Sequence, residues 1–550
     1  MRQVRQMKNV IIVGSGISGM TAAIRAAEAG IRVLLVSPFP SERSQSVMAA
    51  GGINAVLENG AAGDSVACHI EDTLKGGCGL AGREAVTGLC EHAGEMIRFL
   101  ERIGTVFSVD EYGRPARRAF GGQSYNRTYY CGSATGKQIV SALVMEVRRL
   151  EAAGLVCRRL WNCFHSALIH DGTCYGVILF DEATGRLTAE YADAVVMATG
   201  GQNALFGKTT GSTQCDGYAA GRLFMQGAEL KNLEFIQFHP TTLETAQKCM
   251  LISEAARGEG GRLFYNRNGK RVYFMEEKYG SRGNLMTRDV ISREIHSAGQ
   301  QVFLDVSFLG RKEIDRRLPE VRDLCLKYGN IDIAREPIPV APGVHFFMGG
   351  LAVRNNHETN IRNLFAIGEC ASIYHGANRL GGNSLLAAMY SGTVAAGEIA
   401  GRDTASKKQD FSAQLDTENR KLAELMNTGS SFPVMYIRDM AAKTLKEHLG
   451  IIRDAESLKK GISDIDYDLS VAGRIRFDSS VMVYANYSLT GILTLARAAL
   501  TCAAARKESR GSHFRSDYPE TDEACNGATI IAYDDGAFKV RLDKERTYES

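Results

Sequence analysis

The feature that most restricts the fold of this chain is a glycine-rich turn close to its start. After Asn9, residues 10–13 are all apolar and β-branched, so that residues 9–13 predict a buried strand, and they lead into Gly14-Ser-Gly-Ile-Ser-Gly19. Residues 20–29 then predict a helix that ends at Gly30, and residues 31–37 predict a second strand. The order strand, glycine turn, helix, strand is typical of a Rossmann-like unit, in which free backbone amides at the helix N-terminus hold a pyrophosphate.

This unit also predicts the first contacts with a dinucleotide cofactor. Glycines let the backbone approach the phosphates closely, so we expect the cofactor to contact Gly14, Ser15, Gly16 and Gly19. The acidic residue that usually ends the second strand and binds the ribose is replaced by Ser37. A serine hydroxyl can still hydrogen-bond to a ribose hydroxyl, so Ser37 stays in the predicted cofactor site.

Composition sets limits on the class of protein. The 550 residues exceed the usual size of one hydrophobic core, and 45% apolar with 23% charged residues is typical of a soluble α/β protein. A net charge of +3 gives no reason to expect a nucleic-acid partner. We see no run of about 18 apolar residues, and so we expect no direct membrane span. Thirteen cysteines without a CxxC pair indicate reduced thiols in a cytoplasmic protein, and we predict no metal site.

Two more strand-and-glycine segments lie far downstream, at residues 194–201 and 363–369. They predict that the nucleotide-binding domain is discontinuous, with an insertion that leaves and returns. The glycine-rich residues 375–386, which contain one arginine, follow the last segment and suggest a flavin with an anion held beside it.

The predicted fold class is therefore α/β. It combines a discontinuous Rossmann-like FAD-binding domain, an inserted α+β capping domain, a helical domain and a small C-terminal region with strand-like pieces. The expected boundaries are 1–235 and 345–402 for the two parts of the FAD-binding domain, 236–344 for the capping domain, 403–505 for the helical domain and 506–550 for the C-terminal region.

Histidines and arginines are grouped in the second half of the chain. Sets of this kind bind small dicarboxylates, because each carboxylate needs cationic or hydrogen-bonding partners. Taken singly, the residues have other interpretations: His239 can be a loop histidine, and Arg288-Asp289 can be a surface ion pair. The candidate catalytic residues are His239, Glu254, Arg257, Arg288, His345 and Arg379.

These motifs together resemble the flavoprotein subunit of the succinate dehydrogenase and fumarate reductase family, which includes L-aspartate oxidase. The resemblance covers nearly the whole chain, and jointly the motifs are highly specific. The matching segments are residues 14–19, 50–52, 119–123, 234–242, 254–261, 288–289, 337–340, 345–350, 375–386 and 506–513.

The resemblance implies a role for each candidate at the substrate site. His239, His345 and Arg379 resemble the family's carboxylate ligands, and Arg288 its general acid, for which Glu254 and Arg257 would form a proton relay. The substrate site would also include Ser253, which stands where the family usually has a threonine and keeps its hydroxyl. Phe120 would line the pocket near the flavin.

The resemblance also extends the predicted FAD site. Glu369 resembles the ribose ligand, Asp216 lies in a Cys-Asp-Gly variant of the usual Gly-Asp-Gly, and Ser384 and Leu385 would face the flavin ring from a helix N-terminus. The cofactor-binding residues predicted from the 50–52 segment are Ala50, Gly51 and Gly52. Membrane-linked members attach FAD through a histidine that is Gln45 here, so the FAD is predicted to be non-covalent.

Two activities within the family compete. L-Aspartate oxidase also lacks the linking histidine, but it usually has a glutamate before the Gly-Gly of the pocket loop, where this chain has Phe120. An apolar ring offers an ammonium group much less than a carboxylate would, which favours fumarate reductase. Succinate oxidation, reduction of another unsaturated acid and a catalytically silent flavin-binding subunit are further alternatives. The resemblance implies an iron-sulfur subunit and a membrane anchor as partners, with the chain peripheral on the inner face of the membrane.

Overall fold

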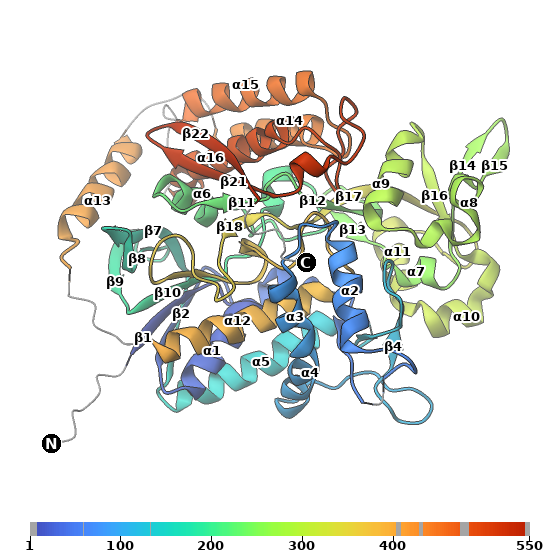
Figure 1. The fold of residues 1–550 in the computed structure, drawn as a ribbon, viewed down its shortest axis with the longest axis horizontal. Coiled ribbons are helices and arrows are strands. Elements are labelled where there is room, and N and C mark those ends of the chain that lie inside the picture. Colours follow the sequence, from blue (N-terminus) through green and yellow to red (C-terminus); the bar gives the residue numbers. More distant parts are fainter. Residues whose placement is uncertain are drawn as a thin grey trace.

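The computed structural model describes residues 8–544, except for Asn59, Ser133 and residues 403–408, 428–432 and 473–482. At its centre is a five-stranded parallel sheet in the order β19-β10-β1-β2-β6 (Figure 1). Its strands are β1 (Asn9–Val13), β2 (Arg32–Ser37), β6 (Val156–Leu160), β10 (Ala194–Met197) and β19 (Leu364–Ala366). The three strand-and-glycine segments predicted from the sequence thus lie side by side, which confirms the discontinuous arrangement.

Helices α1 (Ile17–Glu28), α5 (Thr135–Ala152) and α12 (Asn383–Gly401) pack together against this sheet (Figure 1). Two glycines permit the tight turn between β1 and α1. Gly14 has a φ of +110°, and a Cβ atom at Gly19 would lie only 1.9 Å from the Gly14 carbonyl oxygen. The turn therefore holds the N-terminus of α1 directly beyond the end of β1. The neighbouring helices are α2 (Val66–Gly76), α3 (Arg83–Glu91) and α4 (Ala93–Arg102), whereas α6 (Tyr218–Met225) packs on the helical part.

The inserted part forms an antiparallel sheet with its own hydrophobic core (Figure 1, right). The order is β13 (Cys249–Leu251), β12 (Ile236–Glu244), β17 (Ile338–Phe347), β16 (Val302–Asp305), β14 (Arg262–Arg267) and β15 (Lys270–Val272). Its helices are α7 (Ala255–Gly258), α8 (Phe274–Tyr279), α9 (Arg288–Ser297), α10 (Gly310–Arg317) and α11 (Pro319–Gly329). Strand β17 runs through the boundary expected at residues 344 and 345, so His345 lies on this sheet.

The helical part contains α13 (Ser412–Asn427), α14 (Val434–His448), α15 (Ala455–Ala472) and α16 (Val483–Ala505). Among the described residues, helix α16 is long and apolar enough to cross a membrane by length and composition alone. However, 72% of its most apolar window is buried inside the protein, as in a core helix.

The C-terminal strands do not stand alone. Strands β21 (Ala528–Asp534) and β22 (Ala537–Asp543) form a hairpin, and β21 pairs with β11 (Leu230–Lys231). Strands β18 (Gly350–Ala352) and β20 (Ala371–Ser372) complete that sheet. The remaining strands form two small sheets: β3 (Ile53–Asn54), β4 (Arg117–Arg118) and β5 (Thr128–Tyr129), and β7 (Asn162–His170), β8 (Thr173–Asp181) and β9 (Arg186–Tyr191).

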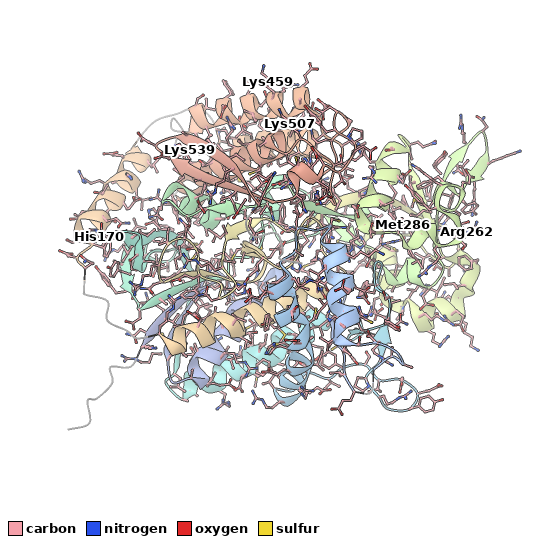
Figure 2. All side chains as sticks on the ribbon, in the orientation of Figure 1. His170, Arg262, Met286, Lys459, Lys507 and Lys539 are labelled. Carbon is pink, nitrogen blue, oxygen red and sulfur yellow. The ribbon has the colours of Figure 1, made fainter. Side chains whose placement is uncertain are left out.

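Several charged side chains without a predicted chemical role lie on the surface. Lys459, Lys507 and Lys539 lie on the outer surface of the helical and C-terminal parts (Figure 2). His170, which matched no motif, is exposed at the end of β7 (Figure 2). These residues lie away from the cavity described next.

Candidate active site

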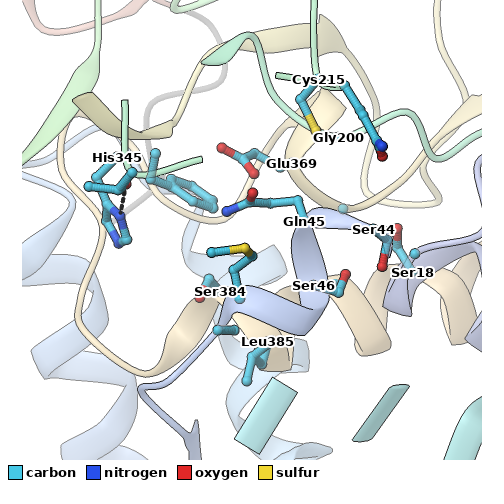
Figure 3. A pocket seen from close by; sticks show the side chains of 18 of the residues that line it. Ser18, Ser44, Gln45, Ser46, Gly200, Cys215, His345, Glu369, Ser384 and Leu385 are labelled. Atoms are coloured by element: carbon cyan, nitrogen blue, oxygen red, sulfur yellow. Dashed lines mark hydrogen bonds between the residues drawn. The ribbon is translucent and has the colours of Figure 1, made fainter. Parts of the chain in front are cut away.

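A cavity of about 380 Å³ lies where the parallel sheet, the N-terminus of α12 and strands β12 and β17 meet. Figure 3 shows side chains from these separate segments converging on it. The predicted cofactor residues that line it are Gly14, Ser15, Gly16, Ser37, Ala50, Gly51, Gly52, Asp216, Glu369, Ser384 and Leu385. Gly19 is the exception: it lies inside α1, where its missing side chain allows close packing on Gly14.

One end of the cavity offers partners for phosphate and ribose groups. The first turns of α1 and α12 both face it, and helix N-termini favour negative charge. Glu369 Oε1 accepts a hydrogen bond from the Phe347 amide at 3.1 Å, and burial raises the pKa of the Glu369 carboxyl to about 7. Ser37 Oγ donates to the Phe39 carbonyl at 2.7 Å, so towards a ribose it acts as an acceptor.

Asp216 lies at the beginning of α6. Its Oδ1 accepts a hydrogen bond from the Tyr218 amide at 3.0 Å, and burial raises the pKa of its carboxyl. Cys215, the departure from the family motif, is buried next to it and also lines the cavity (Figure 3). The substitution therefore leaves Asp216 facing the cavity.

Four buried polar atoms of residues that line the cavity lack hydrogen-bond partners among the described residues: Ser44 Oγ, Gln45 Oε1, His375 Nδ1 and Arg379 Nε. Buried polar groups normally have partners, so these atoms are suited to a polar ligand. Together with the helix N-termini, Asp216 and Glu369, the atoms of Ser44 and Gln45 fit a flavin dinucleotide. The residues that would hold FAD are those that line this part of the cavity.

The candidate proton donor is tied to a carboxylate. Arg288, the first residue of α9, donates from Nε to Glu254 Oε1 at 3.0 Å and from Nη2 to Glu254 Oε2 at 3.1 Å. Glu254 Oε1 also accepts from Arg257 Nη2 at 3.1 Å. Burial alone would raise the pKa of Glu254, but the charges of Arg288 and Arg257 outweigh it and lower that pKa to about 2. Arg257 lies behind Glu254 and does not line the cavity.

The two candidate histidines face each other. The rings of His239 and His345 lie 5.3 Å apart in an edge-to-face arrangement. His239 Nδ1 is 3.0 Å from the Thr241 carbonyl oxygen, and His345 Nδ1 is 2.8 Å from Thr210 Oγ1. Burial and then the charge of Arg288 lower the pKa of both rings well below the usual value, so both are neutral near pH 7.

Arg379 completes the cluster. Its guanidinium lies 4.4 Å from the centre of the Phe346 ring, and its buried Nε has no hydrogen-bond partner among the described residues. Arg257, Arg288 and Arg379 contribute three positive charges, Glu254 contributes one negative charge and the histidines none, which leaves a charge of +2. A cluster of this charge with an unpaired buried donor suits a dianion.

The other predicted pocket residues are also at the cavity wall. Phe120 is buried against Gly51 and Gly381, and Ser253 precedes Glu254 at the same wall. Sequence reasoning missed Gln237 and Thr210, which hydrogen-bond to the candidate residues. Gln237 could have been found from its position, because residues two apart on a strand point to one face and His239 follows it by two.

The fold and the cavity define an FAD-dependent oxidoreductase with a cluster of arginines and histidines beside the predicted cofactor site. A family model described as an FAD binding domain matches residues 9–385, and one described as the fumarate reductase flavoprotein C-terminal part matches residues 438–548. The chain belongs to the succinate dehydrogenase/fumarate reductase flavoprotein subunit family, as the sequence predicted.

Similar proteins span nearly the whole chain. The succinate dehydrogenase flavoprotein subunit of Bacillus subtilis is 36% identical over 539 residues, covering 94% of this chain and 92% of that protein. L-Aspartate oxidase of the same organism is 33% identical over 544 residues, covering 98% and 96%. A solved structure of a mutant FrdA of E. coli quinol fumarate reductase matches with a TM-score of 0.90 and 30% identity, covering 99% of this chain and 98% of that chain. The predicted fold class is thereby confirmed.

Proposed function

We propose that this chain is the catalytic flavoprotein of a fumarate reductase, which converts fumarate to succinate. The observation that carries the proposal is the buried cluster of charge +2 beside the flavin cavity. Fumarate carries two negative charges, and an anion of that charge would match the cluster. When bound and reduced, FAD supplies the hydride that adds to one carbon of the double bond.

In this proposal the side chains of the cluster bind and polarise the two carboxylates. Neutral His239 and His345 act as hydrogen-bond donors, and Arg379 provides charge together with its unpaired Nε. Donors arranged in advance stabilise charge that develops during reaction. Ser253 and Phe120 complete the pocket wall and help to exclude water.

Arg288 would donate the proton to the second carbon. Its unusual role is supported by the carboxylate at 3.0 Å, since Glu254 can return a proton to Arg288 and draw one from Arg257. An Arg288→Ala variant is expected to bind fumarate more weakly, because one cation is lost, and not to reduce it even when fumarate is saturating. Near-normal turnover of that variant would remove Arg288 from the mechanism.

We propose that FAD is held without a covalent bond. Gln45 lines the cavity at the position where membrane-linked members have the linking histidine, and an amide does not alkylate readily. Acid precipitation should therefore release all the flavin into the supernatant; flavin that stays with the pellet would contradict this. An unalkylated flavin is less oxidising, which favours fumarate reduction over succinate oxidation, and bleaching of the flavin by succinate would argue for the reverse direction.

L-Aspartate oxidase is the alternative, favoured by the absence of the histidine at position 45. Against it stands Phe120, a buried ring where a carboxylate would bind the substrate ammonium. The deciding measurement is the anaerobic flavin spectrum of the purified chain. Oxidation of reduced flavin by fumarate, without bleaching of oxidised flavin by L-aspartate, supports fumarate reductase; bleaching by L-aspartate supports the oxidase.

The proposed partners are an iron-sulfur subunit and, through it, a membrane anchor, with the chain on the inner, cytoplasmic face. The support is the membership of the chain in a family of flavoprotein subunits. Purification from a membrane fraction should recover the chain together with an iron-sulfur protein. Recovery of the chain alone from the soluble fraction would favour a soluble electron donor.

A further inference from the structure

Gln237 lies on β12, two residues before His239, and only 1% of it is exposed. Its Oε1 accepts hydrogen bonds from Arg288 Nη1 at 3.0 Å and from Arg379 Nη2 at 2.9 Å. Its Nε2 donates to Asn378 Oδ1 at 2.8 Å and to the Arg379 carbonyl oxygen at 2.9 Å. Both acceptor positions and both donor positions of this one amide are thus used at the candidate site.

A second contact joins the same segments. Asn378 Nδ2 donates to Asp289 Oδ1 at 2.9 Å. The two segments are therefore connected twice. Arg288 is connected to Arg379 through Gln237, and Asp289 accepts a hydrogen bond directly from Asn378. This arrangement links the start of α9 to the glycine-rich loop before α12.

The atom that bridges the two guanidiniums is Gln237 Oε1, an uncharged amide oxygen. Arg288 and Arg379 are like charges in a buried site, and burial together with the Arg288 charge lowers the pKa of Arg379. A carboxylate between them would cancel one positive charge and compete with an anionic ligand. The neutral amide oxygen accepts a hydrogen bond from each guanidinium and leaves both charges in place.

We infer that Gln237 is a positioning residue that holds Arg288 and Arg379 side by side as a two-cation receptor for a dicarboxylate. This inference rests on the proposed function in one respect only, namely that the ligand is a dicarboxylate. It does not depend on whether fumarate or L-aspartate is the physiological substrate, because both carry two carboxylates.

The test compares two replacements of Gln237 in the full-length, FAD-loaded chain. Gln237→Met keeps the length of the side chain but removes the bridging oxygen, and Gln237→Glu keeps the shape but adds a negative charge. The matched control is Gln226→Met, because Gln226 also hydrogen-bonds in both directions, to the Ala167 amide and carbonyl, far from the arginines. The readout is the change in the flavin spectrum on titration with malonate, an unreactive dicarboxylate, and with acetate.

Losing hydrogen bonds to two charged groups should weaken malonate binding by roughly 10- to 100-fold in Gln237→Met. Gln237→Glu should weaken it about 10-fold further, since its carboxylate cancels one charge. Acetate binding should fall much less in both variants, a difference that a purely structural role would not produce. Gln226→Met should bind malonate like the unmodified chain.

Malonate binding within threefold of the unmodified chain in both variants would overturn the inference. If Gln237→Met fails to retain FAD, Gln237→Glu decides alone, and tight malonate binding by it would also overturn the inference. The proposed function fails separately: a chain that binds malonate but does not reduce fumarate retains the receptor and loses only the proposed reaction.

Discussion

Replacing Phe120 by glutamate tests how the charge of the pocket sets its ligand. Phe120 is 8% exposed and lines the cavity. A Cβ atom at Gly381 would lie 3.1 Å from the Phe120 Cβ and 3.4 Å from Glu254 Oε2, so Phe120 and Glu254 flank the same glycine. Phe120→Glu therefore introduces a second carboxylate beside the first, and the guanidiniums keep it ionised. The charge of the cluster falls from +2 to +1.

The size of the effect follows from the repulsion between the new carboxylate and a bound substrate carboxylate. At a separation of ~6 Å and an effective dielectric constant of ~20, this repulsion is about 3 kcal/mol. That energy corresponds to roughly a 100-fold weaker binding of a dicarboxylate. Phe120→Gln has the same shape without the charge, so the ratio between the two variants isolates the electrostatic effect from the loss of the ring.

The assay is the dissociation constant of malonate, measured from the flavin spectrum, together with kcat/KM for fumarate with a reduced dye as electron donor. Both should be about 100-fold worse in Phe120→Glu than in Phe120→Gln. Phe120→Leu serves as an apolar control and should stay close to the unmodified chain. If the Glu and Gln variants differ by less than threefold, the carboxylate is screened or protonated, and the charge argument for the pocket is wrong.

Two further predictions concern residues that hold or surround the site. Thr210→Val removes the hydroxyl that lies 2.8 Å from His345 Nδ1, and it should lower kcat/KM for fumarate about 10-fold. Thr210→Ser keeps a hydroxyl and should retain the activity. Equal activity of both variants would show that Thr210 does not orient the His345 ring. Burial raises the pKa of Glu369 from its ordinary value of 4.5 to about 7. Between these pH values the folded chain without FAD binds one more proton at this residue than the unfolded chain does. Its free energy of unfolding should therefore fall as pH rises from about 5 to 8. Denaturant titrations of FAD-depleted Glu369→Gln should show a flatter pH dependence, and an unchanged slope would assign that dependence to other groups.

The nucleotide-binding unit could be predicted because its signals are local. An apolar run, a glycine turn and a helical segment follow each other within 30 residues, and the structure has β1, α1 and β2 in that order. Helix α1 begins at Ile17, three residues before the predicted start, because Gly16 lies at its N-cap and the last glycine of the motif is inside the helix. The close approach of Gly19 to the Gly14 carbonyl explains why glycine is needed there, and its contact with the cofactor stays a prediction.

Local sequence patterns do not predict which distant segments of the chain pair with each other. The strand-like residues 528–533 were recognised, but their pairing with Leu230–Lys231 depends on contacts about 300 residues apart in sequence. The predicted domain boundaries remain predictions, and strand β17 crosses one of them.

The candidate site shows the same limit at the level of single residues. Its cations and Glu254 were found because charged residues in motifs are conspicuous, whereas the neutral Gln237, which holds two of the cations together, was not. Like charges from separate segments repel each other in a buried cavity, so their arrangement requires compensation that the cations themselves cannot reveal. Glu254 provides one part of it through Arg288 and Arg257, and Gln237 provides the other part through Arg288 and Arg379. The Glu254 carboxylate cancels one of the three positive charges, and the neutral Gln237 amide bridges two guanidiniums without cancelling any, which is why the cluster keeps a charge of +2.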